Sequence, residues 1–171
     1  SIAVFAITLI YATSVSAQDF KPLDKSPMDV ASFPSSYRES NKVVKVTYSR
    51  PQLKGRELSK LAPAGKVWRT GANEAAEITF YKDVNFGGKD VKAGTYTLFT
   101  IPAEQGVWTV ILSKQINVWG SYFYNKDQDV VRVSGDVTQP NKNIEAFSIM
   151  FDDNMTLKMG WANKIISVPI K

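Results

Sequence analysis

Short runs of alternating apolar and polar residues recur along most of the chain, and turn residues separate them at close spacing. The runs are 42–49 (KVVKVTYS), 76–82 (AEITFYK), 94–102 (GTYTLFTIP), 107–113 (VWTVILS), 129–135, 145–151, 156–161 and 164–170. Gly87-Gly88 is a typical two-residue hairpin turn. Only residues 56–61 suggest a helix, of a turn or two. The pattern predicts an all-β fold, namely an antiparallel β-sandwich of immunoglobulin-like or jelly-roll-like type with at most one short helix.

The first 41 residues differ from the rest. Residues 2–12 are almost all apolar and uncharged, and small residues follow, with Val15 and Ala17 where a signal peptidase reads. This predicts a signal peptide over 1–17, cleavage after Ala17, and a periplasmic or extracellular protein. The run is shorter than the about 20 residues of a membrane span. The alternative to a signal peptide is a buried N-terminal strand or helix. Residues 18–41 are rich in Ser, Pro and charge and are expected to be an extended lead-in to a single domain over 42–171.

Two residue types are missing, and their absence limits the chemistry. The chain has no Cys and no His, which excludes Ser-His-Asp and Cys-His catalysis. The usual ligands of zinc, copper and haem are absent for the same reason. The net charge is +5, but the lysines are scattered and no basic stripe with interleaved aromatics is present, so we expect no nucleic-acid partner. We also expect no cofactor and no metal.

Oxygen ligands for calcium are the one metal chemistry left open. Two stretches carry such ligands. They alternate with other residues in NKDQD (Asn125, Asp127, Asp129) and are adjacent in FDDN (residues 151–154). Calcium needs six to eight oxygens, and neither stretch supplies a full loop. Because Asp and Asn are also the residues that turns prefer, we interpret both stretches as turns.

The most polar candidate site is the loop VWRTGANEA over residues 67–75. Gly71 permits a positive φ and Asn73 tolerates one, so the chain is expected to change direction here. One interpretation is structural, with Arg50 or Arg69 pairing with Glu74 to fix the loop. The other is that the two guanidinium groups converge on an anionic ligand such as a carboxylate or a phosphate.

A second candidate is an aromatic cluster in NVWGSYFYNKD, where Trp119, Tyr122, Phe123 and Tyr124 lie between two predicted strands. Exposed rings beside Asn, Asp and Lys would form a platform for sugars or for apolar side chains of a partner. The alternative is that the rings cap one end of the core. The sequence does not decide between the two.

Several blocks in the same order carry a resemblance to a known family. The blocks are YSRPQLKGREL, GKVWRTGANEAAEITF, KAGTYTLFTIP, WTVILSK and NVWGSY. They resemble the bacterial family catalogued as domain of unknown function 2911, over about residues 26–170. The resemblance implies an exported protein of the kind found in Bacteroidota and transfers no activity. The positions that match the family pattern are Arg50, Trp68, Arg69, Asn73 and Glu74.

These observations favour an exported, non-catalytic binding or envelope-interaction module, whose partner is a small molecule, a glycan or an envelope protein. The candidate ligand-binding residues are Arg50, Trp68, Arg69, Asn73, Glu74, Trp119 and Tyr122. The alternative is a carboxylate-dependent hydrolase of a cell-envelope or dietary glycan that uses Glu74 or Glu77. Their odd spacing would place these two carboxylates on opposite faces of an extended strand, which makes them poor partners. A third possibility is an assembly partner that acts through surface contacts alone.

Overall fold

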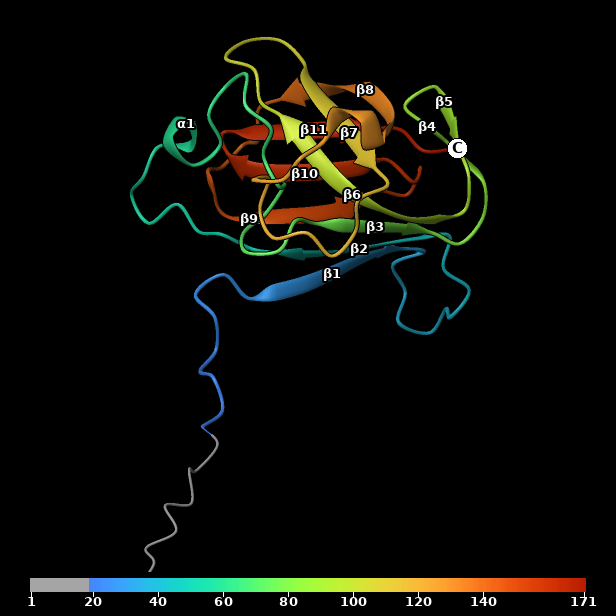
Figure 1. The fold of residues 1–171 in the computed structure, drawn as a ribbon, viewed down its shortest axis with the longest axis horizontal. Coiled ribbons are helices and arrows are strands. Elements are labelled where there is room, and N and C mark those ends of the chain that lie inside the picture. The colour runs from blue at the N-terminus through green and yellow to red at the C-terminus, as the bar shows by residue number, and fades with distance from the viewer. Residues whose placement is uncertain (1–18) are drawn as a thin grey trace, which may run out of the picture.

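The structure is a computed structural model that describes residues 19–171 (Figure 1). The predicted signal peptide over 1–17 lies outside the described residues. The strands are β1 (Met28–Phe33), β2 (Val44–Ser49), β3 (Glu77–Phe80), β4 (Val84–Phe86), β5 (Lys89–Val91), β6 (Gly94–Ile101), β7 (Trp108–Ser113), β8 (Asp129–Thr138), β9 (Ile144–Phe151), β10 (Leu157–Ala162) and β11 (Lys164–Val168). The two short helices are α1 (Leu58–Leu61) and the 3-10 turn η1 (Lys126–Gln128). The predicted all-β character is confirmed.

Nine of these strands form one antiparallel sheet in the order β1-β2-β3-β6-β7-β8-β11-β10-β9, and β4 pairs with β5 in a separate hairpin. The large sheet curls until its ends nearly meet. The segment after β2 bonds to β9, because Leu53 N donates to Glu145 O (3.0 Å) and Phe147 N donates to Pro51 O (2.9 Å). The sheet is therefore barrel-like and nearly closed. The two-sheet sandwich expected from the sequence is not confirmed. The positions of strands in a sequence do not specify which strands pair, so the pattern could not distinguish a sandwich from a barrel-like sheet.

Arg50 joins the two ends of the sheet where the segment after β2 meets β9, a junction that we call the seam. It follows β2, and its Nε donates to the Phe147 carbonyl (3.1 Å) while its Nη2 donates to Ser148 Oγ (2.7 Å), both on β9. Its Nη1 pairs with Asp29 on β1 (3.1 Å). Three nitrogens of one guanidinium thus join both ends of the sheet, which is the geometry a planar fork of donors allows.

The core is built around stacked and edge-on rings inside the curled sheet. Trp68 is buried; its ring stacks on Trp161 at 5.3 Å and meets Phe147 edge-on at 5.0 Å. Trp108 adds a further edge-on contact with Trp68 at 6.4 Å. Such pairs add about 0.5–1.5 kcal/mol each beyond the burial of their area. Trp68, a candidate ligand-binding residue in the sequence, is part of this core.

The expected lead-in over 18–41 contains a strand that the sequence did not predict, whereas the Gly87-Gly88 hairpin turn was predicted correctly. Residues 28–33, inside the expected lead-in, form β1, which pairs with β2 along its whole length. Gly87 and Gly88 have positive φ (56° and 88°) and join β4 to β5, as the hairpin prediction required.

Within residues 19–171, no helix has both the length and the apolar character needed to cross a membrane.

Candidate functional site

The two candidate loops of the sequence lie against each other. Gly120 N donates to Asn73 O (2.9 Å) and Ala75 N donates to Val118 O (3.0 Å). Ser121 Oγ adds a bond to the carbonyl of residue 67 (3.0 Å). Residues 67–75 and 115–124 therefore form one surface, which we call the loop face.

The first loop is fixed to the barrel by its main chain. Trp68 exchanges both backbone bonds with Thr100 of β6 (2.7 and 3.0 Å). Thr70 and Asn73 adopt positive φ (53° and 59°), so the prediction for Asn73 is confirmed. Gly71, which permits a positive φ, does not adopt one. Gly71 is needed instead for close approach, since a Cβ there would lie 3.0 Å from a backbone oxygen at the end of β2.

Three of the four clustered rings point to solvent. Trp119 is 57% exposed, Tyr122 77% and Phe123 80%. Tyr124 behaves differently and packs edge-on against the buried Phe99 at 5.2 Å. The core-capping alternative thus holds for Tyr124 alone. The other three rings are exposed on residues 119–123 of the loop face, and we call this stretch the aromatic platform.

A hydrogen-bonded group supports the end of this platform. The Tyr124 hydroxyl donates to Asp129 Oδ2 (2.6 Å), and Arg132 Nε donates to the same oxygen (2.6 Å). Arg132 Nη2 also donates to the Tyr124 hydroxyl. Burial, followed by the bond to Asp129, raises the pKa of Tyr124 to about 12. The sequence analysis missed this group, because Arg132 and Tyr124 meet only when η1 folds the loop back onto β8.

Arg69 lies on the loop face, and its side chain forms no hydrogen bond or ion pair with residues 19–171. Its Nε is buried and meets no acceptor among these residues. Its Nη1 is 3.7 Å from the point where a Cβ on Gly120 would stand, and the Tyr122 ring lies 2.7 Å from that same point. Among the ion pairs of residues 19–171, none joins Arg69 or Arg50 to Glu74. The predicted pin between an arginine and Glu74 is therefore wrong.

The two acidic side chains of the loop region share a hollow of ≈ 250 Å³, which is also lined by Met28 and Tyr48. The extended strand that would place Glu74 and Glu77 on opposite faces does not span both residues. Strand β3 begins only at Glu77, so strand alternation does not extend back to Glu74. The Glu77 carboxylate accepts the backbone N–H of Asn117 (2.7 Å), whereas Glu74 is exposed.

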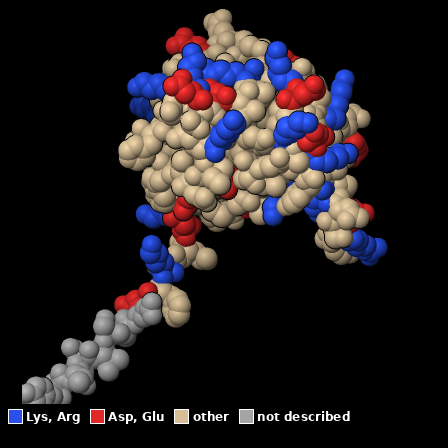
Figure 2. Space-filling model, turned by 45° about the vertical axis from the view of Figure 1, so that its right-hand side comes forward, with Lys and Arg blue, Asp and Glu red and all other residues tan. Residues whose placement is uncertain are grey.

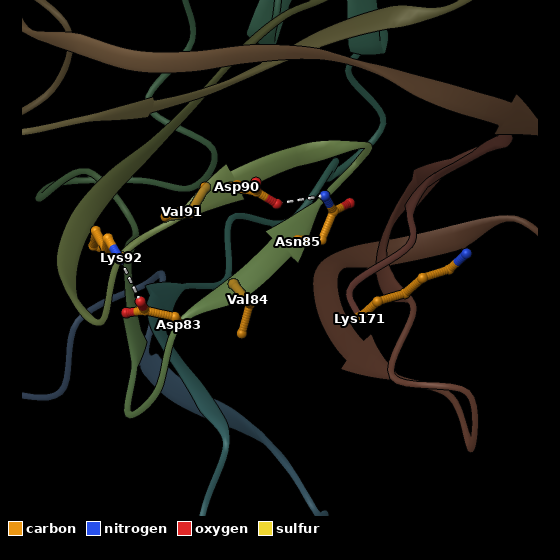
Figure 3. Close-up of a pocket in the computed structure, with 7 residues that line it drawn as sticks. All are labelled: Asp83, Val84, Asn85, Asp90, Val91, Lys92 and Lys171. Atoms are coloured by element: carbon orange, nitrogen blue, oxygen red, sulfur yellow. Dashed lines mark hydrogen bonds and ion pairs between the residues drawn. The ribbon is translucent and has the colours of Figure 1, made fainter.

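A different hollow, of ≈ 340 Å³, lies at the β4–β5 hairpin (Figure 3). Its acidic groups are already engaged: Asp83 pairs with Lys92 (2.7 Å), and Asp90 accepts from Asn85 Nδ2 (2.9 Å). The bond from Lys92 lowers the pKa of Asp83. The Lys171 side chain extends away from the hairpin in Figure 3. We assign no role to this hollow.

The two candidate calcium stretches form turns. Asn125 Oδ1 accepts the Asp127 N–H (3.0 Å) at the start of η1. Asp152 Oδ1 accepts from Asn154 N (3.1 Å) and Thr156 N (2.9 Å). Among the described residues, no three His, Cys, Asp or Glu side chains gather where they could hold a metal ion.

Charged side chains are mixed on the face drawn in Figure 2, where Lys and Arg lie among Asp and Glu and large uncharged areas separate them. This distribution agrees with the scattered lysines of the sequence.

Comparison with known proteins identifies the family. A family model described as protein of unknown function (DUF2911) matches residues 26–170. The chain belongs to the DUF2911 family. The match takes in every strand from β1 to β11 and both loops of the loop face, so the candidate site lies within the DUF2911 domain. No curated protein and no solved structure matched the chain.

Proposed function

We propose that this DUF2911 protein is an exported, non-catalytic binding module that takes a glycan on the loop face. Export rests on the predicted signal peptide over residues 1–17. Binding rests on one observation, the exposure of Trp119, Tyr122 and Phe123 on a loop tied by main-chain bonds to residues 67–75. Soluble proteins rarely leave rings grouped in water without a use for them.

A glycan suits this arrangement chemically. One side of a sugar ring carries C–H groups, which pack against the negative face of an aromatic ring. The edge of the sugar carries hydroxyls, which need polar partners, and Asn73 and Glu74 lie beside Trp119 in the joined loops. Because main-chain bonds hold the loops, little ordering free energy is lost on binding.

The hydrolase alternative has weaker support. A glycosidase needs two carboxyl groups free to act across one sugar, one of them as a proton donor. Glu74 and Glu77 do line a common hollow, but the Glu77 carboxylate already accepts the Asn117 N–H. Glu74 is exposed to water rather than enclosed. These features favour binding without catalysis.

The test is a binding screen of the purified protein on an oligosaccharide array, followed by titration of the best ligand. We expect Trp119→Ala to weaken binding about 5- to 30-fold, since one ring buried against a sugar contributes on the order of 1–2 kcal/mol. Tyr81→Ala is the matched control, because Tyr81 is 51% exposed but lies at the far end of β3. The proposal fails if no oligosaccharide binds, or if both variants bind like the parent protein.

A further inference from the structure

Arg69 differs from the other arginines of the chain. Arg38, Arg50, Arg56 and Arg132 each donate at least one side-chain hydrogen bond. Arg69 donates none within residues 19–171, although its Nε is buried. A guanidinium carries five N–H donors, and a buried donor without an acceptor costs about 1–3 kcal/mol. Among the described residues, the other buried side-chain donor without an acceptor is Trp108 Nε1, which carries no charge, so Arg69 is the charged group that the fold leaves uncompensated.

The surroundings hold that group in place without satisfying it. The backbone of Gly120 is fixed by its bond to Asn73 O (2.9 Å), and its φ of +66° brings the Tyr122 ring over its Cα. Arg69 Nη1 lies beside this glycine. The terminal nitrogens of Arg69 are not among the buried unpaired atoms, so they reach solvent next to the exposed ring.

The nearby carboxylates leave the charge of Arg69 uncompensated. Glu77 is engaged by the Asn117 N–H, and Glu74 forms no ion pair with a described residue. The loop face thus combines a cation that forms no ion pair with a described residue and aromatic rings that are exposed in residues 19–171. An anionic ligand with a ring beside its charge would pair with the terminal nitrogens of Arg69 and cover one of the exposed rings.

On the basis of the proposed function, we propose that the ligand is an acidic oligosaccharide and that Arg69 binds a uronate carboxylate. A carboxylate matches the planar fork of a guanidinium and accepts two parallel bonds from it. The sugar ring that bears the carboxylate, or its neighbour, packs on Trp119 or Tyr122. Arg69 then sets the preference for acidic over neutral chains, and the aromatic platform supplies the contact common to both.

The proposal also makes a statement about stability. If Arg69 serves a ligand and makes no bond in the free protein, Arg69→Gln should leave the urea midpoint unchanged or raise it, as substitutions at binding sites often do. If Arg69 were structural, the same change would lower the midpoint.

The experiment is calorimetric titration of the purified protein with trigalacturonate and with the neutral trimer maltotriose at low salt. We expect trigalacturonate to bind at least tenfold more tightly. Arg69→Gln should abolish that difference, and Arg69→Lys should retain part of it. Arg56→Gln removes the same charge from a residue that bonds only to nearby carbonyls, and it should behave like the parent protein.

The outcomes separate this inference from the proposed function. Equal binding of the two trimers, weakened by Trp119→Ala, would overturn the acidic preference and leave glycan binding standing. A preference for trigalacturonate that survives in Arg69→Gln would show that another group binds the acid. A lower urea midpoint for Arg69→Gln would show a structural arginine. Absence of binding by either trimer and by the whole oligosaccharide array would overturn both proposals.

Discussion

Replacing Arg50 by Ala should open the seam of the barrel-like sheet and destabilise the protein. The change removes bonds to the Phe147 carbonyl (3.1 Å) and Ser148 Oγ (2.7 Å) on β9. It also removes the pair with Asp29 (3.1 Å). These acceptors lie on both ends of the sheet, and no neighbouring side chain replaces the guanidinium fork.

The expected loss of unfolding free energy depends on how exposed the contacts of Arg50 are to solvent. The side chains of Arg50 and Asp29 are 36% and 43% exposed, so their ion pair contributes about 0–1 kcal/mol. The two bonds to β9 contribute about 1 kcal/mol each. The sum is about 2–3 kcal/mol. At a urea m-value of about 2 kcal/mol/M, the unfolding midpoint should fall by about 1–1.5 M.

The assay is urea unfolding followed by tryptophan fluorescence, because Trp68 and Trp161 lie in the core next to Phe147. Arg56→Ala is the matched control: Arg56 also donates two bonds to carbonyls, but only to residues three and four positions away. It should shift the midpoint by less than half as much. Equal midpoints for the Arg50 and Arg56 variants would refute the role of Arg50 in closing the sheet.

Two further predictions concern the supports of the loop face and the core. The pKa of Tyr124 is about 12 in the folded protein against 10 for the free side chain, so the folded state holds this proton more tightly. The stability this confers is complete below pH 10 and is lost as the pH rises towards 12. Urea midpoints measured across this range should show a fall that is smaller in Tyr124→Phe, and identical profiles would contradict the assignment. Gly135→Ala should lower the midpoint by about 0.5–1.5 M, that is about 1–3 kcal/mol, because its Cβ would stand 2.5 Å from Ile166 Cγ2 and 2.9 Å from Val110 Cγ2. An unchanged midpoint would show that β8 and its neighbours can move apart to accept the methyl group without a loss of stability.

The sequence predicted the strands well because alternation is a local property. The runs over 42–49, 94–102 and 107–113 correspond to β2, β6 and β7, and the Gly87-Gly88 turn joins β4 to β5. Closure of the sheet could not be predicted in this way. The Phe147 carbonyl that Arg50 bonds on β9 is 97 residues away, and no pattern near Arg50 specifies it.

The candidate site was predicted as two separate places for the same reason. Asn73 and Gly120 are brought together by a backbone bond, which leaves no trace in composition or spacing. Arg69, Glu74 and Trp119 lie on the resulting face, whereas Arg50 and Trp68 belong to the framework. Residue type alone does not separate an arginine that closes a seam from one whose donors remain free.

The seam has a consequence for how the chain folds. Its two sides come from residues 50–53 and 145–148, so the sheet cannot close until most of the chain is available. Closure also costs the entropy of bringing together two segments that lie far apart in the sequence. Topologies dominated by such distant contacts fold in milliseconds to seconds rather than microseconds. During that time β1 and β9 expose unpaired edges, which are sites of misassociation. The rate of refolding, and not only its endpoint, should therefore depend on protein concentration and on Arg50.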